Sequence, residues 1–274
     1  MLFVTDAAEE LQKLEISVKD IELEKKPIAR GGFGQVYNAM WGTEKVVVKV
    51  INIDSEDRPE EKSMNEAILT FRLQHKNVIK VFGITRPQSG QFGIVMELAE
   101  HGSLDKWIGK INQVKMTKIA LGIVDGLEYV HSRHVIHRDI KPKNIVMFGP
   151  EDGMIPKIAD FGVSKLIQTA AVTHSRVGQD LYMAPEVKML NRYSFPADIF
   201  SLAMTLFEMF NEQLIQQSSE EVMQFIVSVA SGRISEFPQS CKVSGCLLGV
   251  IKRGWNDKAV ERPPLSEYRS ALEG

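Results

Sequence analysis

The chain has 274 residues, of which 44% are hydrophobic and 25% charged, and its formal net charge is −2 at pH 7. This near-neutral balance gives no indication of a nucleic-acid-binding surface. Two cysteines are too few for a disulfide framework, and no uninterrupted apolar run reaches the roughly 18 residues of a membrane span. The composition is that of a globular protein. Because no basic and apolar leader opens the sequence, we expect a cytoplasmic protein.

The first third of the chain is predicted to be rich in strands. Residues 6–15 are a candidate amphipathic helix. After them, short runs of valine, isoleucine and aromatic residues are bounded by glycine, asparagine or proline, a pattern typical of strands. These runs are residues 18–29, 34–42, 45–53, 78–86 and 91–98. Residues 60–73 interrupt them as one predicted helix, because their apolar side chains recur at helical spacing.

After residue 102 the pattern becomes helical. Residues 116–132 place their apolar side chains on one stripe, and residues 196–210 are apolar nearly all round, which predicts a buried helix. Further helices are predicted over residues 219–230, 246–255 and 263–273. The sequence therefore indicates a small sheet-rich lobe followed by a larger helical lobe.

Two stretches of the sheet-rich lobe are suited to phosphate binding. In ARGGFGQVY (residues 29–37), glycines lie between two predicted strands and allow backbone N–H groups to approach phosphate oxygens. A plain glycine-rich hairpin is the alternative, and no helix follows as a dinucleotide-binding fingerprint requires. In the next strand, VVVK ends at Lys49. A lysine there is usually exposed at a sheet edge, but Glu66 in the predicted helix supplies a carboxylate that would pair with it.

Two stretches of the helical lobe carry catalytic and metal-binding groups. In the predicted loop HRDIKPKN (residues 137–144), Asp139 can accept a hydroxyl proton and Lys141 can neutralise a phosphoryl group. The amide oxygen of Asn144 is a hard ligand suited to Mg²⁺. In KIADFG a strand is predicted to end in Asp160, a second candidate magnesium ligand.

The order of these stretches is more specific than any one of them. The chain has a glycine-rich loop, Lys49, Glu66, HRDIKPKN, DFG and then YMAPE. In this order it resembles the eukaryotic protein kinase catalytic domain, over about residues 20–272. The resemblance implies an α+β, bilobal protein kinase fold. A small antiparallel-sheet N-lobe holds one main helix, and a larger C-lobe is helical.

The resemblance also implies how the chain is divided and what it uses. Residues 1–19 are an N-terminal extension and residues 20–274 the kinase domain, with the N-lobe at about 20–97 and the C-lobe at about 103–274. The implied activity is transfer of the γ-phosphoryl of ATP, with Mg²⁺, to protein substrates. No nucleic-acid partner and no membrane span are expected.

Each implied role falls on a residue of this chain. Asp139 would orient the substrate hydroxyl and accept its proton, and Lys141 would stabilise the γ-phosphoryl group. Asn144 and Asp160 would hold Mg²⁺. The residues implied in nucleotide binding are Ala29, Gly31, Gly34, Val36, Val47, Lys49, Glu66, Met96, Glu97, Ala99 and Val146. Structural roles are also implied: Glu186 would pair with Arg262, and Asp198 would anchor the catalytic loop.

Other motifs indicate specificity and control. Lys141-Pro142, and Tyr182-Met183 before APE, resemble serine/threonine rather than tyrosine kinases. IELEKKPIARGGFGQVY and the ending GW…ERPPLSEYRSALE resemble the tyrosine-kinase-like group, which contains the mixed-lineage and receptor-interacting kinases. Ser175 lies eleven residues before APE's glutamate, the offset of the main activating phosphosite, with Thr173 as second candidate. Arg138 is implied to capture that phosphate.

Four positions depart from the family pattern and leave an alternative open. They are Ala29 for the first loop glycine, Val47 for an alanine, Thr70 for an apolar residue, and Gln179 for a threonine or serine. The alternative is a nucleotide-binding pseudokinase or scaffold that acts by conformation. Every implied metal and catalytic residue is present, which favours an active enzyme. A small-molecule phosphotransferase is disfavoured, because such relatives generally lack an APE-type segment.

Overall fold

The structure is a computed structural model. It describes residues 13–31, 34–53, 60–161, 165–166, 181–190, 193–212, 220–230, 242–243 and 245–274. The chain divides into two compact units, Met1–Ala99 and Glu100–Gly274. The mixed α+β architecture predicted from the sequence is confirmed. Within the described ranges, no helix is both long and apolar enough to cross a membrane.

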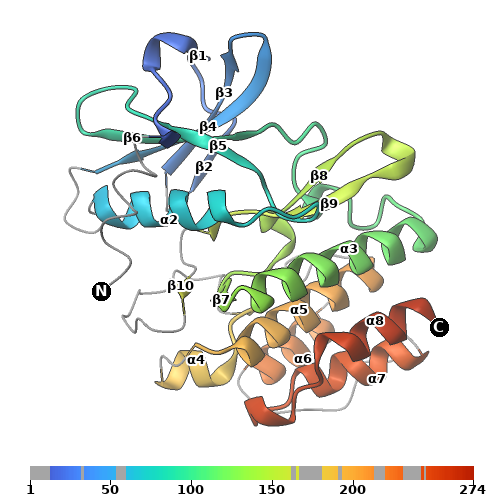
Figure 1. Cartoon of the computed structure of the whole chain (residues 1–274). Helices are drawn as coiled ribbons and strands as arrows, with labels where there is room; N and C mark the ends of the chain where they lie inside the picture. Colours follow the sequence, from blue (N-terminus) through green and yellow to red (C-terminus); the bar gives the residue numbers. More distant parts are fainter. Residues whose placement is uncertain are drawn as a thin grey trace. The chain divides into compact units, whose positions relative to one another are not determined.

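The first unit is built on an antiparallel sheet whose described strands follow the order β1-β3-β4-β6-β5, with β2 paired to β3 (Figure 1). Its strands are β1 (Ile21–Leu23), β2 (Ala29–Gly31), β3 (Gly34–Trp41), β4 (Glu44–Asn52), β5 (Val81–Thr85) and β6 (Gln91–Glu97). The predicted strand runs are confirmed for β3 to β6. The run at residues 18–29 is divided, because a 3-10 turn at Val18–Asp20 and a short loop flank β1.

Alternate residues of β4 serve two different cores. Val48 belongs to a buried cluster on one face of the sheet. Ile51 belongs to another, which includes Ala67 of helix α2 (Glu60–Arg72). Because neighbouring side chains on a strand point to opposite faces, Lys49 lies on the same face as Ile51. The β-branched sequence of β4 therefore builds both cores and directs one lysine toward the α2 side.

The second unit is mainly helical (Figure 1). Its described helices are α3 (Gln113–Ser132), α4 (Pro185–Leu190), α5 (Phe195–Phe210), α6 (Glu220–Ala230), α7 (Gly245–Gly254) and α8 (Leu265–Glu273). Its short strands pair as β7 (Val135–Ile136) with β10 (Lys165–Leu166), and β8 (Ile145–Phe148) with β9 (Ile155–Ile158). Helix α5 is buried from Ala197 to Met209, as its continuous apolar sequence predicts.

Local signals explain where the helices differ from prediction. Helix α3 begins three residues earlier than predicted, because the Asn112 side chain accepts from the Lys115 N–H at 2.9 Å and caps it. Helix α4 was not predicted, since six residues are too short to show a helical period. The helix predicted at residues 6–15 lies almost wholly outside the described residues. Of its described part, residues 13–15, Lys13 and Leu14 are helical.

Candidate functional site

A buried ion pair joins the sheet of the first unit to helix α2. The Lys49 Nζ lies 2.8 Å from the Glu66 Oε1, and the two side chains are 9% and 6% exposed. Burying two charges costs several kcal/mol, which their attraction offsets only in good geometry. Such a pair contributes little net stability, but it fixes the direction of the lysine ammonium group.

Four of the candidate nucleotide-binding residues of the sheet share one face. Val36 lies opposite Lys49 in the β3–β4 register, and Val47 lies opposite Met96 in the β4–β6 register. Residues directly opposite in an antiparallel pair point to the same side, and Val47 precedes Lys49 by two. The register therefore places all four on the α2 face of the sheet.

The glycine-rich turn before β3 requires glycine at one described position. Gly34 has a φ of +133°, and a Cβ built there would lie 2.4 Å from the Val50 carbonyl oxygen. Gly31 lies opposite it at the end of β2, and Ala29 lies opposite Val36. Ala29 sits in a regular strand, so its methyl group is accommodated where the family has glycine.

The end of β6 is tied to the segment before β5. The Glu97 N–H donates to the Lys80 carbonyl at 3.1 Å, and the Glu97 carboxylate accepts from the Lys80 N–H at 2.7 Å. These bonds fix the backbone of Glu97, two residues before Ala99. Both residues were predicted to offer backbone groups to adenine, and this role stays a prediction.

In the second unit, two residues of the HRDIKPKN loop converge on the carboxylate of a third. The Lys141 Nζ lies 2.8 and 2.7 Å from the two oxygens of Asp139. The Asn144 Nδ2 donates to the Asp139 Oδ2 and to its backbone carbonyl, both at 2.8 Å. Because both amide hydrogens of Asn144 are used, its side chain has an oxygen to offer a cation.

Asp198, in the first turn of α5, holds the loop by its backbone. Its carboxylate accepts from the N–H groups of His137 and Arg138, each at 2.8 Å, and lies 2.9 Å from the His131 Nε2. Burial alone would raise the pKa of Asp198, but the hydrogen bond and charge of His131, with the other donors, outweigh burial and lower it. The predicted anchor is confirmed.

Two of the four described non-glycine residues with positive φ angles lie in the candidate site. Arg138 and Asp160 have positive φ angles of 73° and 63°, a conformation that costs non-glycine residues energy and persists only where the surroundings impose it. The hydrogen bond that the Arg138 N–H donates to the Asp198 carboxylate holds this conformation at Arg138. The Arg138 guanidinium lies 4.3 Å from the ring centroid of Tyr193. No motif in the sequence indicated this contact.

The candidate metal ligands lie at the open end of the β8–β9 hairpin. Ile145 pairs with Ile158, and the Ala159 N–H donates to the Asn144 carbonyl at 2.8 Å. Strand β9 ends at Ile158, so it does not reach Asp160 as predicted. Val146 lies on β8 and forms an isolated bridge with Ser103. Among the residues the structure describes, no group of three or more His, Cys, Asp or Glu forms a metal cluster.

His137 is buried beside this hairpin. Its ring lies 4.8 Å from that of Phe161 in a T-shaped arrangement. The Asp139 N–H donates to its Nδ1 at 3.3 Å, and its Nε2 lies 3.1 Å from the Ala159 carbonyl. An Nδ1 that accepts and an Nε2 that donates describe the neutral imidazole. Burial lowers the pKa of His137 below its ordinary value of 6.5, against the opposing charges of the nearby aspartates.

We expect the stability of the second unit to fall as the pH drops below about 6.5. There the unfolded chain protonates His137 while the folded chain keeps it neutral. The free energy of unfolding then falls by up to about 1.4 kcal/mol per pH unit. Asp198 affects stability only at lower pH. Because its pKa is depressed in the folded chain, its contribution to the free energy of unfolding is kept until the pH falls below its ordinary pKa of 3.8. Urea unfolding at pH 7.5, 6.5 and 5.5 measures the slope. A His137→Gln variant with an unchanged slope would contradict this assignment.

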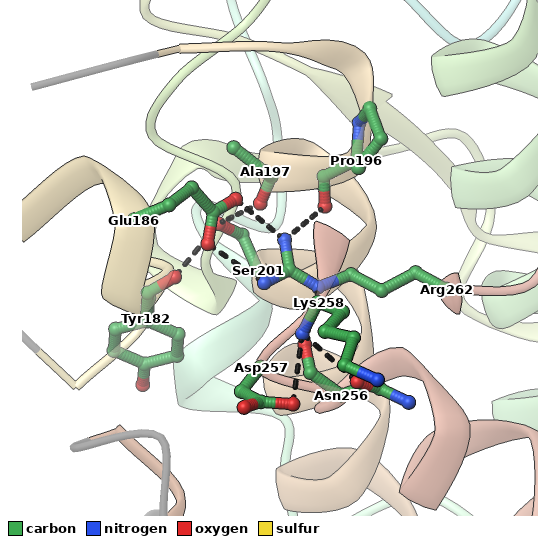
Figure 2. A network of polar contacts seen from close by, with 9 residues as sticks. All are labelled: Tyr182, Glu186, Pro196, Ala197, Ser201, Asn256, Asp257, Lys258 and Arg262. Carbon is green, nitrogen blue, oxygen red and sulfur yellow. Dashed lines mark hydrogen bonds and ion pairs between the residues drawn. The ribbon is translucent and has the colours of Figure 1, made fainter. Parts of the chain in front are cut away.

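A second ion pair ties the YMAPE segment to α5 (Figure 2). The Arg262 guanidinium donates to both Glu186 oxygens at 2.7 Å and to the Pro196 carbonyl at 2.8 Å. Its Nε donates to the Asn256 carbonyl at 2.9 Å. The Arg262 side chain is 0% exposed and that of Glu186 is 17% exposed. The predicted buried pair is confirmed.

Sequence reasoning missed one polar contact in α5. The Tyr182 hydroxyl donates to the buried carboxylate of Glu208 at 2.6 Å, and burial raises the pKa of Tyr182. An acid in the apolar run of residues 196–210 was a signal, because a buried carboxylate needs a donor. The Ser201 hydroxyl also donates, to the Tyr182 carbonyl at 2.7 Å (Figure 2).

Some predicted positions have a different environment or lie outside the described residues. Thr70 stands where an apolar residue was expected, and its hydroxyl donates to the Glu66 carbonyl in the same helix at 2.8 Å. Val47, which stands where the family has an alanine, is buried, with 8% of its surface exposed. Thr173, Ser175 and Gln179 lie outside the described residues.

The sequence of this chain is similar to those of known protein kinases. The family described as "Protein kinase domain" matches residues 23–270. The serine/threonine-protein kinase STY46 of Arabidopsis thaliana is 28% identical over 94% of this chain and 45% of its own length. Cysteine-rich receptor-like protein kinase 26 from the same plant is 33% identical, over 95% and 43%. Probable serine/threonine-protein kinase mkcB of Dictyostelium discoideum is 28% identical, over 97% and 37%. The chain thus spans less than half the length of these relatives.

Proposed function

The chain belongs to the protein kinase domain family, and from this premise we propose that it transfers the γ-phosphoryl group of ATP to serine and threonine hydroxyls of proteins. The observation that carries the proposal is the convergence of Lys141 and Asn144 on the Asp139 carboxylate. Phosphoryl transfer needs positioning and charge neutralisation more than covalent chemistry. A carboxylate for the hydroxyl proton, an ammonium for the phosphoryl charge and an amide oxygen for a cation meet these needs.

Asp139 would orient the acceptor hydroxyl and take its proton, and Lys141 would stabilise the charge on the γ-phosphoryl oxygens. In the first unit Lys49, held by Glu66, would bind the α- and β-phosphates. The sheet residues on the same face would receive the nucleotide, with Glu97 and Ala99 offering backbone groups to adenine.

The donor set fits magnesium. Asn144 and Asp160 supply an amide and a carboxylate oxygen at one end of a hairpin, and Mg²⁺ prefers oxygen ligands completed by substrate phosphates. When bound, the ion would neutralise phosphate charge. The protein's contribution is to hold the two oxygens: Asn144 by its bonds to Asp139, and Asp160 by a backbone in the left-handed region.

Serine and threonine specificity is supported by two features. Lys141-Pro142 and Tyr182-Met183 resemble the serine/threonine kinase pattern, and the names of STY46 and mkcB describe such enzymes. The tyrosine-kinase-like subgroup is proposed from the phrasing at both ends of the domain. A protein substrate is part of the same proposal.

Incubation with Mg²⁺ and γ-labelled ATP tests the proposed activity. We expect label on serine or threonine of the chain itself or of a generic protein substrate, after acid hydrolysis and phosphoamino-acid separation. Measurable nucleotide binding without any transfer would favour a scaffold that acts by conformation. Label confined to phosphotyrosine would contradict the proposed specificity.

We further propose that phosphorylation of Ser175, or failing that Thr173, activates the enzyme through Arg138. A phosphate adds about −1.5 to −2 charge at pH 7, enough to order a segment against an arginine. We expect phosphatase treatment to lower the transfer rate on the order of tenfold, and a Ser175→Ala/Thr173→Ala variant to match the treated protein. Arg138→Ala should make the treated and untreated forms equal, whereas Arg133→Ala at an exposed site should preserve the difference. Equal rates before and after treatment of the wild-type chain would reject this control.

A further inference from the structure

The segment before β1 extends the sheet of the first unit. The Ile16 N–H donates to the Ile84 carbonyl at 2.7 Å, and Glu15 forms a parallel bridge with Ile84. Strand β5 is last in the described strand order, and an edge strand presents backbone groups that need a partner. Glu15 also pairs with Arg86 at 3.0 Å, although both side chains are about half exposed, so this pair contributes little.

Two side chains of this segment enter the two cores of the unit. Leu14 is 2% exposed and belongs to the buried cluster that includes Ala67 and Ile68 of α2. Ile16 packs against the cluster on the opposite face of the sheet. The segment is therefore fixed from both sides, and its leucine shares a cluster with the helix turn that carries Glu66.

Strand β5 has a glycine where the segment approaches. A Cβ built on Gly83 would lie 2.3 Å from the Leu14 carbonyl oxygen and 2.8 Å from the Ile16 Cδ1. The pairing of β5 with β6 shifts between Val81 and Gly83. A glycine within a strand weakens it, and it is expected where another backbone comes close. Gly83 thus makes room for the segment.

Helix α2 is held to the sheet by the Lys49–Glu66 pair and by apolar side chains that join one buried cluster. Phe71 is 36% exposed, and the hydroxyl of Ser63 is buried with no hydrogen-bond partner among the described residues. An unsatisfied buried hydroxyl destabilises the element that carries it. Ala67 and Ile68 belong to the cluster that holds Leu14, and Met64 packs against it, so the apolar attachment of the helix shares its core with Leu14.

We propose that residues 13–17 are a docking segment that holds α2 against the sheet, and that Leu14 is a positioning residue for the Lys49–Glu66 pair. The kinetic part of this proposal rests on the proposed kinase function, while the docking part does not. Loss of the segment would free α2 and misplace Glu66 without altering any residue that meets the nucleotide.

The test compares the full chain with Leu14→Ala and Gly83→Ala, the second of which displaces the segment without changing it. Hydrogen exchange is measured in peptides covering residues 14–17 and 60–72. We expect exchange at α2 to rise about tenfold or more in both variants, with residues 145–158 unchanged. Leu14→Met, which conserves volume, and Gly249→Ala, where an added Cβ meets nothing within 4 Å, are the matched controls and should resemble wild type.

Kinetics show whether the effect passes through Glu66. We expect Leu14→Ala to lower kcat/KM for ATP about tenfold, and to have no further effect in a Glu66→Gln background, because coupled residues are not additive. Equal losses in both backgrounds would overturn the positioning role. If the wild-type chain transfers no phosphate, the proposed function fails alone, and faster exchange at α2 still supports docking. If exchange rises in residues 14–17, which shows that the segment is released, but stays unchanged at α2, the whole inference is overturned.

Discussion

An Asp139→Asn variant is expected to lose phosphoryl transfer by about 10²–10⁴-fold, the range for removing a positioned general base. Its affinity for the nucleotide should stay within a few fold of wild type. Asparagine preserves the size of the side chain and can still accept from Lys141, which lies 2.7 Å away. It cannot take up the hydroxyl proton. Initial rates with a protein substrate and equilibrium titration with ATP measure the two effects separately.

The control for this variant is Asp152→Asn, the same change at a fully exposed aspartate paired with Lys115. It should leave both quantities unaltered. Turnover near wild type in Asp139→Asn would remove Asp139 from the proposed mechanism. A parallel loss of nucleotide affinity would indicate that the carboxylate contributes to binding.

Replacing Arg262 by methionine is expected to lower the free energy of unfolding by about 3–5 kcal/mol, the cost of removing one partner of a buried ion pair. The guanidinium is fully buried and donates to Glu186 and to the carbonyls of Pro196 and Asn256. Methionine fills part of the volume but donates nothing. Urea unfolding of the two proteins under identical conditions gives the difference.

Arg253→Met is the matched control, since it breaks an exposed pair with Glu267 on a neighbouring surface. Exposed pairs contribute about 0–1 kcal/mol, so this variant should unfold near wild type. Similar small losses in both variants would mean that the Glu186–Arg262 pair is not a main support of the YMAPE segment. A double replacement, Glu186→Met with Arg262→Met, should recover part of the loss, because no charge remains unpaired.

Much of this arrangement follows from local sequence. The β-branched run of β4 predicts a strand with two buried faces, and the alternation of its side chains places Lys49 toward the helix that carries Glu66. The short offsets between Asp139 and Asn144 place both in one predicted loop, and the 3-10 turn at Pro142–Asn144 brings them into hydrogen-bond contact. The continuous apolar run of α5 predicts its burial.

Contacts between distant residues could not be predicted in this way. Arg138 stacks on Tyr193, and Leu14 reaches the core because Gly83, 69 positions later, lacks a side chain. The helical pattern of residues 6–15 and the strand pattern of residues 78–86 do not show that Leu14 and Gly83 meet, so only the packed structure reveals the contact. The predicted end of β9 was wrong by two residues, because Asp160 has a positive φ of 63°, which extended strand backbone does not adopt.

The anchoring of the catalytic loop by Asp198 has a consequence for biosynthesis. The two backbone bonds join residues that are 61 and 60 positions apart, so closing this loop is entropically costly and late relative to local helix formation. A chain emerging from the ribosome has made HRDIKPKN well before it has made α5. The loop therefore cannot take its strained conformation until translation has passed residue 210, and we infer that catalytic competence is acquired together with the central helix rather than before it.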